Sequence, residues 1–352
     1  MENRIKWIDL SRVIAILAVI FCHCFDNTYY YIIDLTVNAL SFSSKFFVFS
    51  GYIFGRLGVP FFLLITGYLL LDRKYDNEKT NRFWSKNCKH LIICTIIWCI
   101  IYELFLIFVM HNDYTLITVL GDILLLRPMN INHIWYMPMI IGMYVLIPLV
   151  ANGLKEFDTD TLVKPLLFFL VLCSVIPFLL KILQIYDITG LSVQVSLGFS
   201  GGMYGIYIIT GYLIKKGLLK RFSSMKLFII LIISIVVTVI FQIFSFNQDY
   251  AYYLWYDFPF MYLISICLFE LISRINDIKA YDIIYFLSKF AFAVYLIHNL
   301  FKLLISEMMK EININASIRV FILWISVILL SYLATFIISK IPRIGKYVLY
   351  IK

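Results

Sequence analysis

Long apolar runs separated by short polar segments dominate the hydrophobic pattern of the chain. A helix needs about 17–25 mostly apolar residues to cross a lipid bilayer. Ten runs reach or approach this length: residues 8–25, 57–71, 91–110, 134–151, 165–183, 197–214, 227–246, 255–272, 285–305 and 318–338. They predict an all-α polytopic membrane protein with about ten transmembrane helices and a single integral-membrane domain over residues 1–352. Residues 46–54, which lie outside these ten runs, could form a re-entrant or interfacial segment.

Lysine and arginine are distributed unevenly between the two sides of this predicted bundle. With a cytoplasmic N-terminus, most of the 30 basic residues fall on the inner side, including clusters at residues 73–89, 215–226 and 340–352. The longest outer segment, from Asp26 to Arg56, contains only Lys45 and Arg56 as basic residues. Because cytoplasmic loops are enriched in Lys and Arg, we expect both termini in the cytoplasm.

The composition supports the same class. The chain is 62% hydrophobic and 14% charged, whereas a soluble domain is about 45–50% apolar and about 25% charged. The enrichment of Lys and Arg on the predicted cytoplasmic side explains the net charge of +9, so no nucleic-acid partner is expected. The seven cysteines form no CxxC pair, and Cys22-His23-Cys24 is too tight for a tetrahedral zinc framework, so no metal site is expected.

The first apolar run contains three ionisable residues, Asp9, Arg12 and His23. On a helix, Arg12 and His23 lie within about 20° of the same face and about 16 Å apart along the axis, and Asp9 is the neighbour of Arg12. Charged groups inside a bilayer are costly and usually functional. A histidine can act as a general base on a hydroxyl, and an arginine can hold a phosphate or a developing oxyanion. Alternatively, Asp9 and Arg12 form an interfacial pair and His23 is a helix-end histidine.

Further polar residues occur in or beside later runs. His298 lies near the middle of the ninth run, and His133, Trp135 and Tyr136 lie at the outer end of the fourth. A hydrogen-bonded packing role for His298 and an interfacial aromatic belt for the other three remain open alternatives. Glu103 in the third run needs a partner or water that the sequence does not identify.

The basic loop after the second run begins with Arg73 and Lys74. It is either a topology signal alone or a site for a polyanionic cytosolic donor such as a nucleotide phosphate. The sequence contains no Walker A motif, GxGxxG, HExxH or GxSxG. ATP-driven transport, dinucleotide redox chemistry, zincin activity and the α/β-hydrolase mechanism therefore lack support.

One short sequence occurs twice. Ile-Thr-Gly-Tyr-Leu stands at residues 65–69 and again at residues 209–213, each time ahead of a basic loop. Five residues do not establish an internal repeat. A glycine at each of these places would allow close helix packing, and a tyrosine suits the membrane interface.

Four motifs in order resemble the acyltransferase 3 family of integral-membrane acyltransferases, particularly its members that O-acetylate bacterial surface polysaccharides. The first motif is Arg12-x10-His23. The second is residues 59–69, Val-Pro-Phe-Phe-Leu-Leu-Ile-Thr-Gly-Tyr-Leu, where Thr66 replaces the usual serine. The third is residues 133–137, His-Ile-Trp-Tyr-Met, followed by Tyr144 and Pro148, and the fourth is Tyr295-Leu-Ile-His298.

The resemblance implies an enzyme of the bacterial cytoplasmic membrane. Its donor would be acyl-CoA, usually acetyl-CoA, and its acceptor a sugar hydroxyl of a surface polysaccharide or a lipid-linked precursor. It implies that His23 and Arg12 are essential and that Arg73 and Lys74 hold CoA. Because the soluble extension of some members has no counterpart here, we expect transfer to be completed within the membrane domain or by a separate protein.

The predicted orientation in the membrane assigns different roles to Arg12 and His23 in the first helix. Arg12 lies toward the cytosolic donor and His23 toward the outer acceptor, so we expect His23 to be the base and Arg12 a positioning residue held by Asp9. The competing interpretation is a transporter or flippase for a lipid-linked sugar or small solute. Transporters often have helices broken by Gly or Pro at matching places in two halves. Pro60 and Pro177 do not form such a pair.

Overall fold

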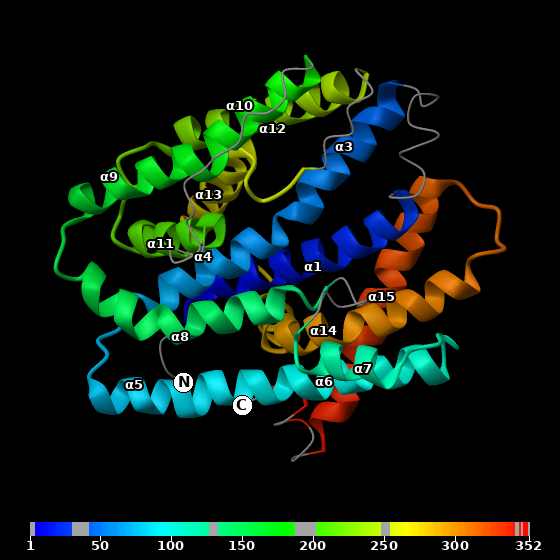
Figure 1. The fold of residues 1–352 in the computed structure, drawn as a ribbon. Helices are drawn as coiled ribbons and strands as arrows, with labels where there is room; N and C mark the ends of the chain where they lie inside the picture. The colour runs from blue at the N-terminus through cyan, green and yellow to red at the C-terminus, as the bar shows by residue number, and fades with distance from the viewer. Residues whose placement is uncertain are drawn as a thin grey trace. The chain divides into compact units, whose positions relative to one another are not determined.

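The structure of the protein is a computed structural model (Figure 1). It describes the ranges 4–29, 42–126, 133–186, 202–247 and 254–341, together with residues 345 and 348–350. Residues 197–201, the predicted start of the sixth run, lie outside the described residues, as do Arg343, Lys346 and Lys352 of the basic tail. Every regular element within the described ranges is a helix, so the all-α fold class is confirmed.

The helices follow one another along the whole chain. Their bounds are α1 (Lys6–Tyr29), α3 (Phe42–Arg56), α4 (Gly58–Leu70), α5 (Asn77–Phe83), η2 (Trp84–Cys88), α6 (Lys89–Phe108), α7 (Leu116–Ile123), α8 (Tyr136–Leu154), α9 (Thr159–Leu170), η3 (Val171–Val175), α10 (Ile176–Ile185), α11 (Gly202–Lys215), α12 (Ser224–Asn247), α13 (Pro259–Ser273), α14 (Tyr281–Met308) and α15 (Ala316–Ser339). η2 and η3 are single π-helical turns that continue the helices on either side.

Polar residues outside the apolar runs determine where several helices begin. Asp76 accepts a hydrogen bond from the backbone N–H of Lys79 at 2.8 Å and caps α5. Asp158 caps α9 through the N–H of Thr161 at 2.6 Å. Each cap satisfies a backbone donor that has no partner inside the helix. Short polar side chains therefore set where these two helices begin.

Eight helical segments in the described part of the chain are long and apolar enough to cross a membrane. They are Lys6–Tyr29, Ser43–Leu70, Asn77–Phe108, Tyr136–Leu154, Thr159–Ile185, Ser224–Ser245, Tyr281–Met308 and Ala316–Ser339. The sixth and eighth predicted runs correspond to α11 and α13, which have 14 and 15 residues. The protein is thus a multi-pass membrane protein, while the count of ten and the orientation stay predictions.

One part of the chain is more helical than the sequence predicts. The predicted outer segment from Asp26 to Arg56 contains the end of α1, which continues to Tyr29, and α3, which occupies residues 42–56. α3 leads directly into α4, so residues 43–70 form one 28-residue helical segment that is long and apolar enough to cross a membrane. The predicted run is shorter because Lys45 and Arg56 interrupt the apolar pattern. Arg56 is in fact 8% exposed.

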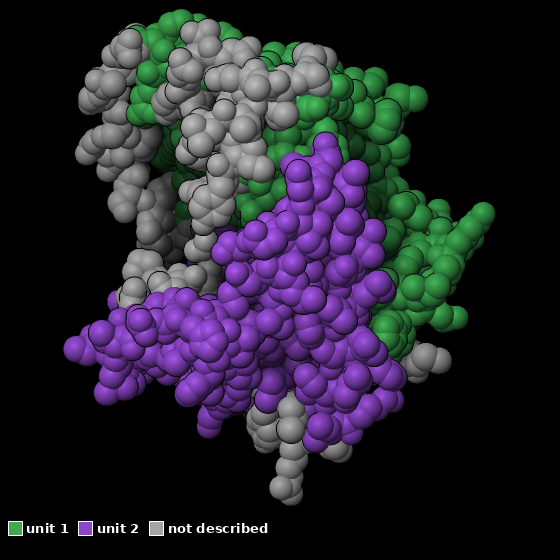
Figure 2. All heavy atoms as spheres, turned by 90° about the vertical axis from the view of Figure 1, so that its right-hand side faces the viewer, with its two compact units in different colours: residues 1–73, 153–288 green, residues 74–152, 289–352 purple. Residues whose placement is uncertain are grey.

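The chain divides into two compact units, coloured separately in Figure 2. Unit 1 comprises Met1–Arg73 and Gly153–Ser288, and unit 2 comprises Lys74–Asn152 and Lys289–Lys352. The boundary passes through α14, which contributes residues to Ser288 to unit 1 and residues from Lys289 to unit 2.

In unit 1, α1 packs against α3 and α4, and α4 packs against α11 (Figure 1). Three glycines, Gly51, Gly55 and Gly58, face α1 at intervals of about one turn. A Cβ at Gly55 would lie 3.0 Å from the Cα of Cys22, and one at Gly58 would lie 2.8 Å from the carbonyl oxygen of Ala15. Small residues allow helix backbones to approach closely in membrane proteins. The glycines thus fix α1 against its neighbours.

Unit 2 is tied together by ring N–H and O–H groups that donate to backbone carbonyls. Trp84 Nε1 donates to the Val145 oxygen at 3.0 Å, and Trp98 Nε1 donates to the Val348 oxygen at 2.7 Å. The hydroxyl of Tyr102, which is fully buried, donates to the Leu296 oxygen at 2.8 Å. The first bond connects η2 to α8, and the other two connect α6 to the C-terminal segment and to the second half of α14.

Candidate active site

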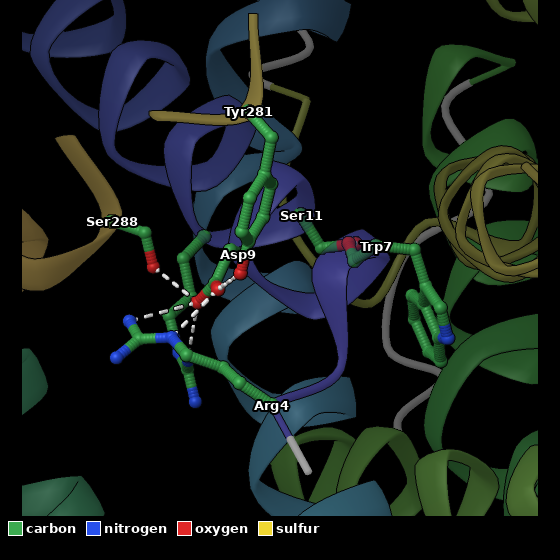
Figure 3. Close-up of polar contacts among 7 residues, drawn as sticks. Arg4, Trp7, Asp9, Ser11, Tyr281 and Ser288 are labelled. Carbon is green, nitrogen blue, oxygen red and sulfur yellow. Dashed lines mark hydrogen bonds and ion pairs between the residues drawn. The ribbon is translucent and has the colours of Figure 1, made fainter. Parts of the chain in front are cut away.

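Asp9 lies in the first turn of α1 and is fully buried. Two arginines converge on its carboxylate (Figure 3). Arg4 donates from Nε to Oδ2 at 2.7 Å and from Nη2 to Oδ1 at 3.1 Å. Arg12 donates from Nη1 to Oδ1 at 2.8 Å. The contact that the three-residue spacing predicted between Asp9 and Arg12 is therefore present.

Two hydroxyl groups from α14 complete the surroundings of Asp9. The Tyr281 hydroxyl donates to Oδ2 at 2.7 Å, and Ser288 Oγ donates to Oδ1 at 2.7 Å (Figure 3). Tyr281 and Ser288 are seven residues apart, two helical turns, so both lie on one face of α14. A buried carboxylate requires such partners, because an unpaired charge in a poorly solvated site is costly.

The network around Asp9 fixes two guanidinium groups with one negative charge. The pKa of Arg4 is raised, chiefly by its hydrogen bond to Asp9, so Arg4 stays protonated. The side chains of Arg4 and Arg12 keep 40% and 29% of their exposure, whereas Asp9 keeps none. The site therefore presents net positive charge on two partly exposed arginines, and the buried Asp9 carboxylate holds both guanidinium groups in place. Such groups suit the binding of a phosphate or another oxyanion.

His23 lies eleven residues after Arg12 on α1, which corresponds to about 16 Å of helix. Its side chain is half-buried, between Cys22 and Cys24, which are both buried. The intermediate exposure is compatible with access by a substrate. The role of His23 as a base stays a prediction.

The second group of predicted site residues meets in unit 2. The rings of His133 and His298 have centroids 5.1 Å apart, although the two residues belong to separate sequence motifs. Tyr295 connects the two histidines, since its hydroxyl donates to the His133 carbonyl oxygen at 2.6 Å and its ring centroid lies 6.0 Å from that of His298. The Tyr295 ring also lies 5.7 Å from that of Tyr136. Trp135 stands beside this group, with its ring 6.1 Å from that of Tyr136.

The tautomer of His298 follows from its hydrogen bond. Nδ1 lies 2.6 Å from the carbonyl oxygen of Tyr295, and a carbonyl can only accept, so Nδ1 carries the proton. In a neutral ring, Nε2 is then the nitrogen with the lone pair. His133 and His298 are 2% and 0% exposed. Both side chains are thus buried within unit 2.

Several residues of these clusters are not among the predicted site residues. Arg4 is five positions before Asp9, and Tyr281 precedes the predicted ninth run, which begins at Tyr285. The seven-residue spacing of Tyr281 and Ser288 is a helical signal that a longer predicted helix would have revealed. Tyr102 packs on His133 with ring centroids 4.9 Å apart and was also missed.

Three further residues that the sequence singled out are described separately. Arg73 and Lys74 are exposed, and Arg73 Nε donates to the Leu69 oxygen at 2.9 Å, where it caps the end of α4. Glu103 is 1% exposed on α6. Within the described ranges, no three or more His, Cys, Asp or Glu side chains are grouped to hold a metal ion.

Comparison with known proteins places the chain in a family. The model of the acyltransferase 3 family, an acyltransferase domain, matches residues 5–340. A search of curated proteins and a search of solved structures each found no match. The match covers Asp9 with its partners Arg12, Tyr281 and Ser288, and also His23 and the two histidines of unit 2. The chain therefore belongs to the acyltransferase 3 family and is a membrane acyltransferase.

Proposed function

We propose that this acyltransferase moves an acyl group, most simply acetyl, from acyl-CoA to a sugar hydroxyl of a cell-surface polysaccharide or its lipid-linked precursor. The observation that carries the proposal is the position of Arg12. It is fixed by the buried carboxylate of Asp9 at 2.8 Å and lies on the same helix as His23. An arginine of fixed geometry suits a phosphorylated donor, and a histidine suits the activation of a hydroxyl.

At the donor end, the anionic part of acyl-CoA would be held by positive charge. Arg12 is part of the Asp9 network, and Arg73 and Lys74 are exposed in the basic loop after α4. With both termini in the cytoplasm, all three residues would face the compartment that contains acyl-CoA. Electrostatic attraction of this kind also raises the rate at which a polyanion associates.

At the acceptor end, His23 would act as the general base. It would take the proton from the sugar hydroxyl while the oxygen attacks the thioester carbonyl carbon. The new C–O bond would form, the C–S bond would break, and the protonated imidazole would return its proton to the CoA thiolate. A positioned base contributes about 10²–10⁴-fold to such a reaction.

The buried group of unit 2 is assigned to the acceptor. Sugars are bound by aromatic faces and by hydrogen-bonding side chains, and Trp135, Tyr136, His133 and His298 supply both kinds. The enzyme would act in the bacterial cytoplasmic membrane, where donor and acceptor lie on opposite sides.

A comparison of surface polysaccharides tests this function. O-acyl signals in the NMR spectrum of the host's surface glycan should disappear when the gene is deleted and return with the wild-type gene. His23→Ala should fail to restore them at equal expression, whereas His111→Asn, at an exposed histidine, should restore them. Unchanged O-acyl content in the deletion strain would refute a glycan acceptor. Full restoration of the O-acyl signals by His23→Ala would refute the role of His23 as the general base.

A further inference from the structure

Arg56 is a buried cation that the proposed reaction does not use. It is the last residue of α3 and keeps 8% of its exposure. Burying a guanidinium is costly unless it is paired, and an apolar side chain of similar volume would avoid that cost. An ionisable residue in such a place is therefore a candidate for a specific role.

The contacts of Arg56 are directed mainly at the last turns of α1. Nη1 donates to the Cys22 sulfur at 2.8 Å, and Nη2 lies 3.4 Å from Asp26 Oδ2. Nε donates to the Leu254 carbonyl oxygen at 3.1 Å, and the Trp255 ring covers the guanidinium with its centroid 5.0 Å away. Arg56 is thus itself immobilised and holds two residues of α1.

Cys22 and Asp26 are four residues apart and lie on one face of α1. His23 stands between them in sequence, about 100° around the helix from Cys22. A helix held at two positions on one face cannot rotate about its axis, so the direction of the Cα–Cβ bond of His23 is fixed. Gly55, directly before Arg56, supports the same turn through its close approach to Cys22.

We infer that Arg56 is a positioning residue that holds the turn of α1 carrying His23. The inference rests on the proposed function for the role of His23, but the ordering of the turn is measurable by itself. Removal of the guanidinium should loosen residues 18–29 and misplace the base. A misplacement of about 1 Å can cost about 100-fold in rate.

The test compares Arg56→Gln, Arg56→Lys and the control Lys181→Gln. Lys181 pairs with Asp257 at 3.7 Å and both keep 29% exposure, so the control removes an ion pair of unit 1 that does not involve α1. Hydrogen exchange of residues 18–29 is followed in purified protein in lipid nanodiscs. Transfer of labelled acetyl from acetyl-CoA to the glycan of host membranes gives kcat and the KM for acetyl-CoA.

Arg56→Gln should accelerate exchange in residues 18–29 and lower kcat by at least about 10-fold, while the KM for acetyl-CoA changes by less than about 2-fold. Arg56→Lys keeps the cation, so its exchange rate in residues 18–29 and its kcat should lie between those of Arg56→Gln and wild-type. Lys181→Gln should change neither the exchange rate nor kcat. Unchanged exchange in Arg56→Gln overturns the inference, and so does faster exchange with wild-type kcat. If wild-type protein transfers no acetyl, the proposed function fails, and the exchange result alone decides whether Arg56 orders this turn.

Discussion

Gly67 and Gly211 occupy equivalent places in two helices whose backbones touch. A Cβ at Gly67 would overlap the carbonyl oxygen of Ile208, and a Cβ at Gly211 would overlap that of Leu64. Leu64 precedes Gly67 by three residues, as Ile208 precedes Gly211. The two copies of Ile-Thr-Gly-Tyr-Leu therefore pack reciprocally where α4 meets α11 (Figure 1).

The symmetry extends to the neighbouring side chains. Thr66 Oγ1 donates to the Phe62 oxygen at 2.8 Å, and Thr210 Oγ1 donates to the Ile206 oxygen at 2.7 Å, each one turn back in its own helix. The reciprocal packing gives the short sequence repeat a physical cause, because each helix needs a residue without a Cβ at the crossing.

Gly67→Ala should therefore prevent the close packing of α4 and α11. Overpacking costs about 1–3 kcal/mol or more, and backbone atoms of Ile208 cannot rotate away as a side chain could, so we expect a loss at the upper end of this range. Gly142→Ala is the matched control, since a Cβ at Gly142 meets nothing within 4 Å. Unfolding in mixed detergent, followed by Trp fluorescence, measures both. Equal stability of the two variants would contradict the close crossing.

The sequence predicted the helices well because the length of an apolar run is a direct signal of a membrane span. It also predicted the contact of Asp9 with Arg12, because helical neighbours follow from a three-residue spacing. It could not predict that Tyr281 and Ser288 bind Asp9, since they are 272 and 279 residues away. Their seven-residue spacing indicates only a shared helix face, because the contact of that face with Asp9 arises from tertiary packing.

Arg56 shows how a local rule misleads. A charge at the edge of an apolar run usually marks a loop, but Arg56 is the last residue of α3. In the structure its charge is balanced by Asp26, which belongs to a different helix. For the repeated sequence Ile-Thr-Gly-Tyr-Leu, the structure shows more than the sequence could establish. Its five residues were too few to argue a repeat, although the packing of Gly67 and Gly211 is reciprocal.

Asp9→Asn should destabilise the protein strongly, because it leaves Arg4 and Arg12 without their counter-charge. Removal of one partner from a buried charged network costs about 3–5 kcal/mol. Ser288→Ala removes one hydrogen bond to the carboxylate and should cost about 1.5–3 kcal/mol. Unfolding in mixed detergent compares them with Asp282→Asn, an exposed carboxylate on α14, which should change little. A loss for Asp9→Asn no larger than that control would contradict the network.

Acid should weaken the ion pairs at the ends of α4 and α11. Asp72 lies 2.6 Å from Lys216 Nζ and 3.2 Å from Lys215 Nζ. Partial burial alone would raise the pKa of Asp72, but the hydrogen bonds from Lys216 and Lys215 outweigh it and lower the pKa below 3.8. The carboxylate therefore stabilises the folded state above about pH 4, and this contribution is lost as the pH falls through the lowered pKa.

Asp72→Asn tests this contribution. The pairs are solvent-accessible, so we expect a loss of about 1 kcal/mol or less at pH 7. Stability measured from pH 7 down to pH 3 should converge for wild-type and variant at the acid end. Glu78→Gln, at an exposed carboxylate of α5, should leave the pH profile unchanged. Parallel profiles for wild-type and Asp72→Asn would contradict the assignment.

Two conservative variants separate the packing role of His298 from a role in catalysis or substrate binding. His298→Asn keeps a donor near Nδ1, which can still bond the Tyr295 oxygen, but it removes the group at Nε2. His298→Gln keeps a polar group near Nε2 and loses the bond to Tyr295. If His298 only packs, the Asn variant should keep acetyl transfer and the Gln variant should lose about 1 kcal/mol of stability. If Nε2 serves the acceptor, the Asn variant should fold normally, as judged by its unfolding midpoint, and lose transfer to host glycan.

Because the His298 ring lies 5.1 Å from that of His133 and its tautomer places the lone pair at Nε2, we expect His298→Asn to fold normally and to lose transfer. Wild-type transfer by His298→Asn would contradict that expectation and assign the histidine to the core.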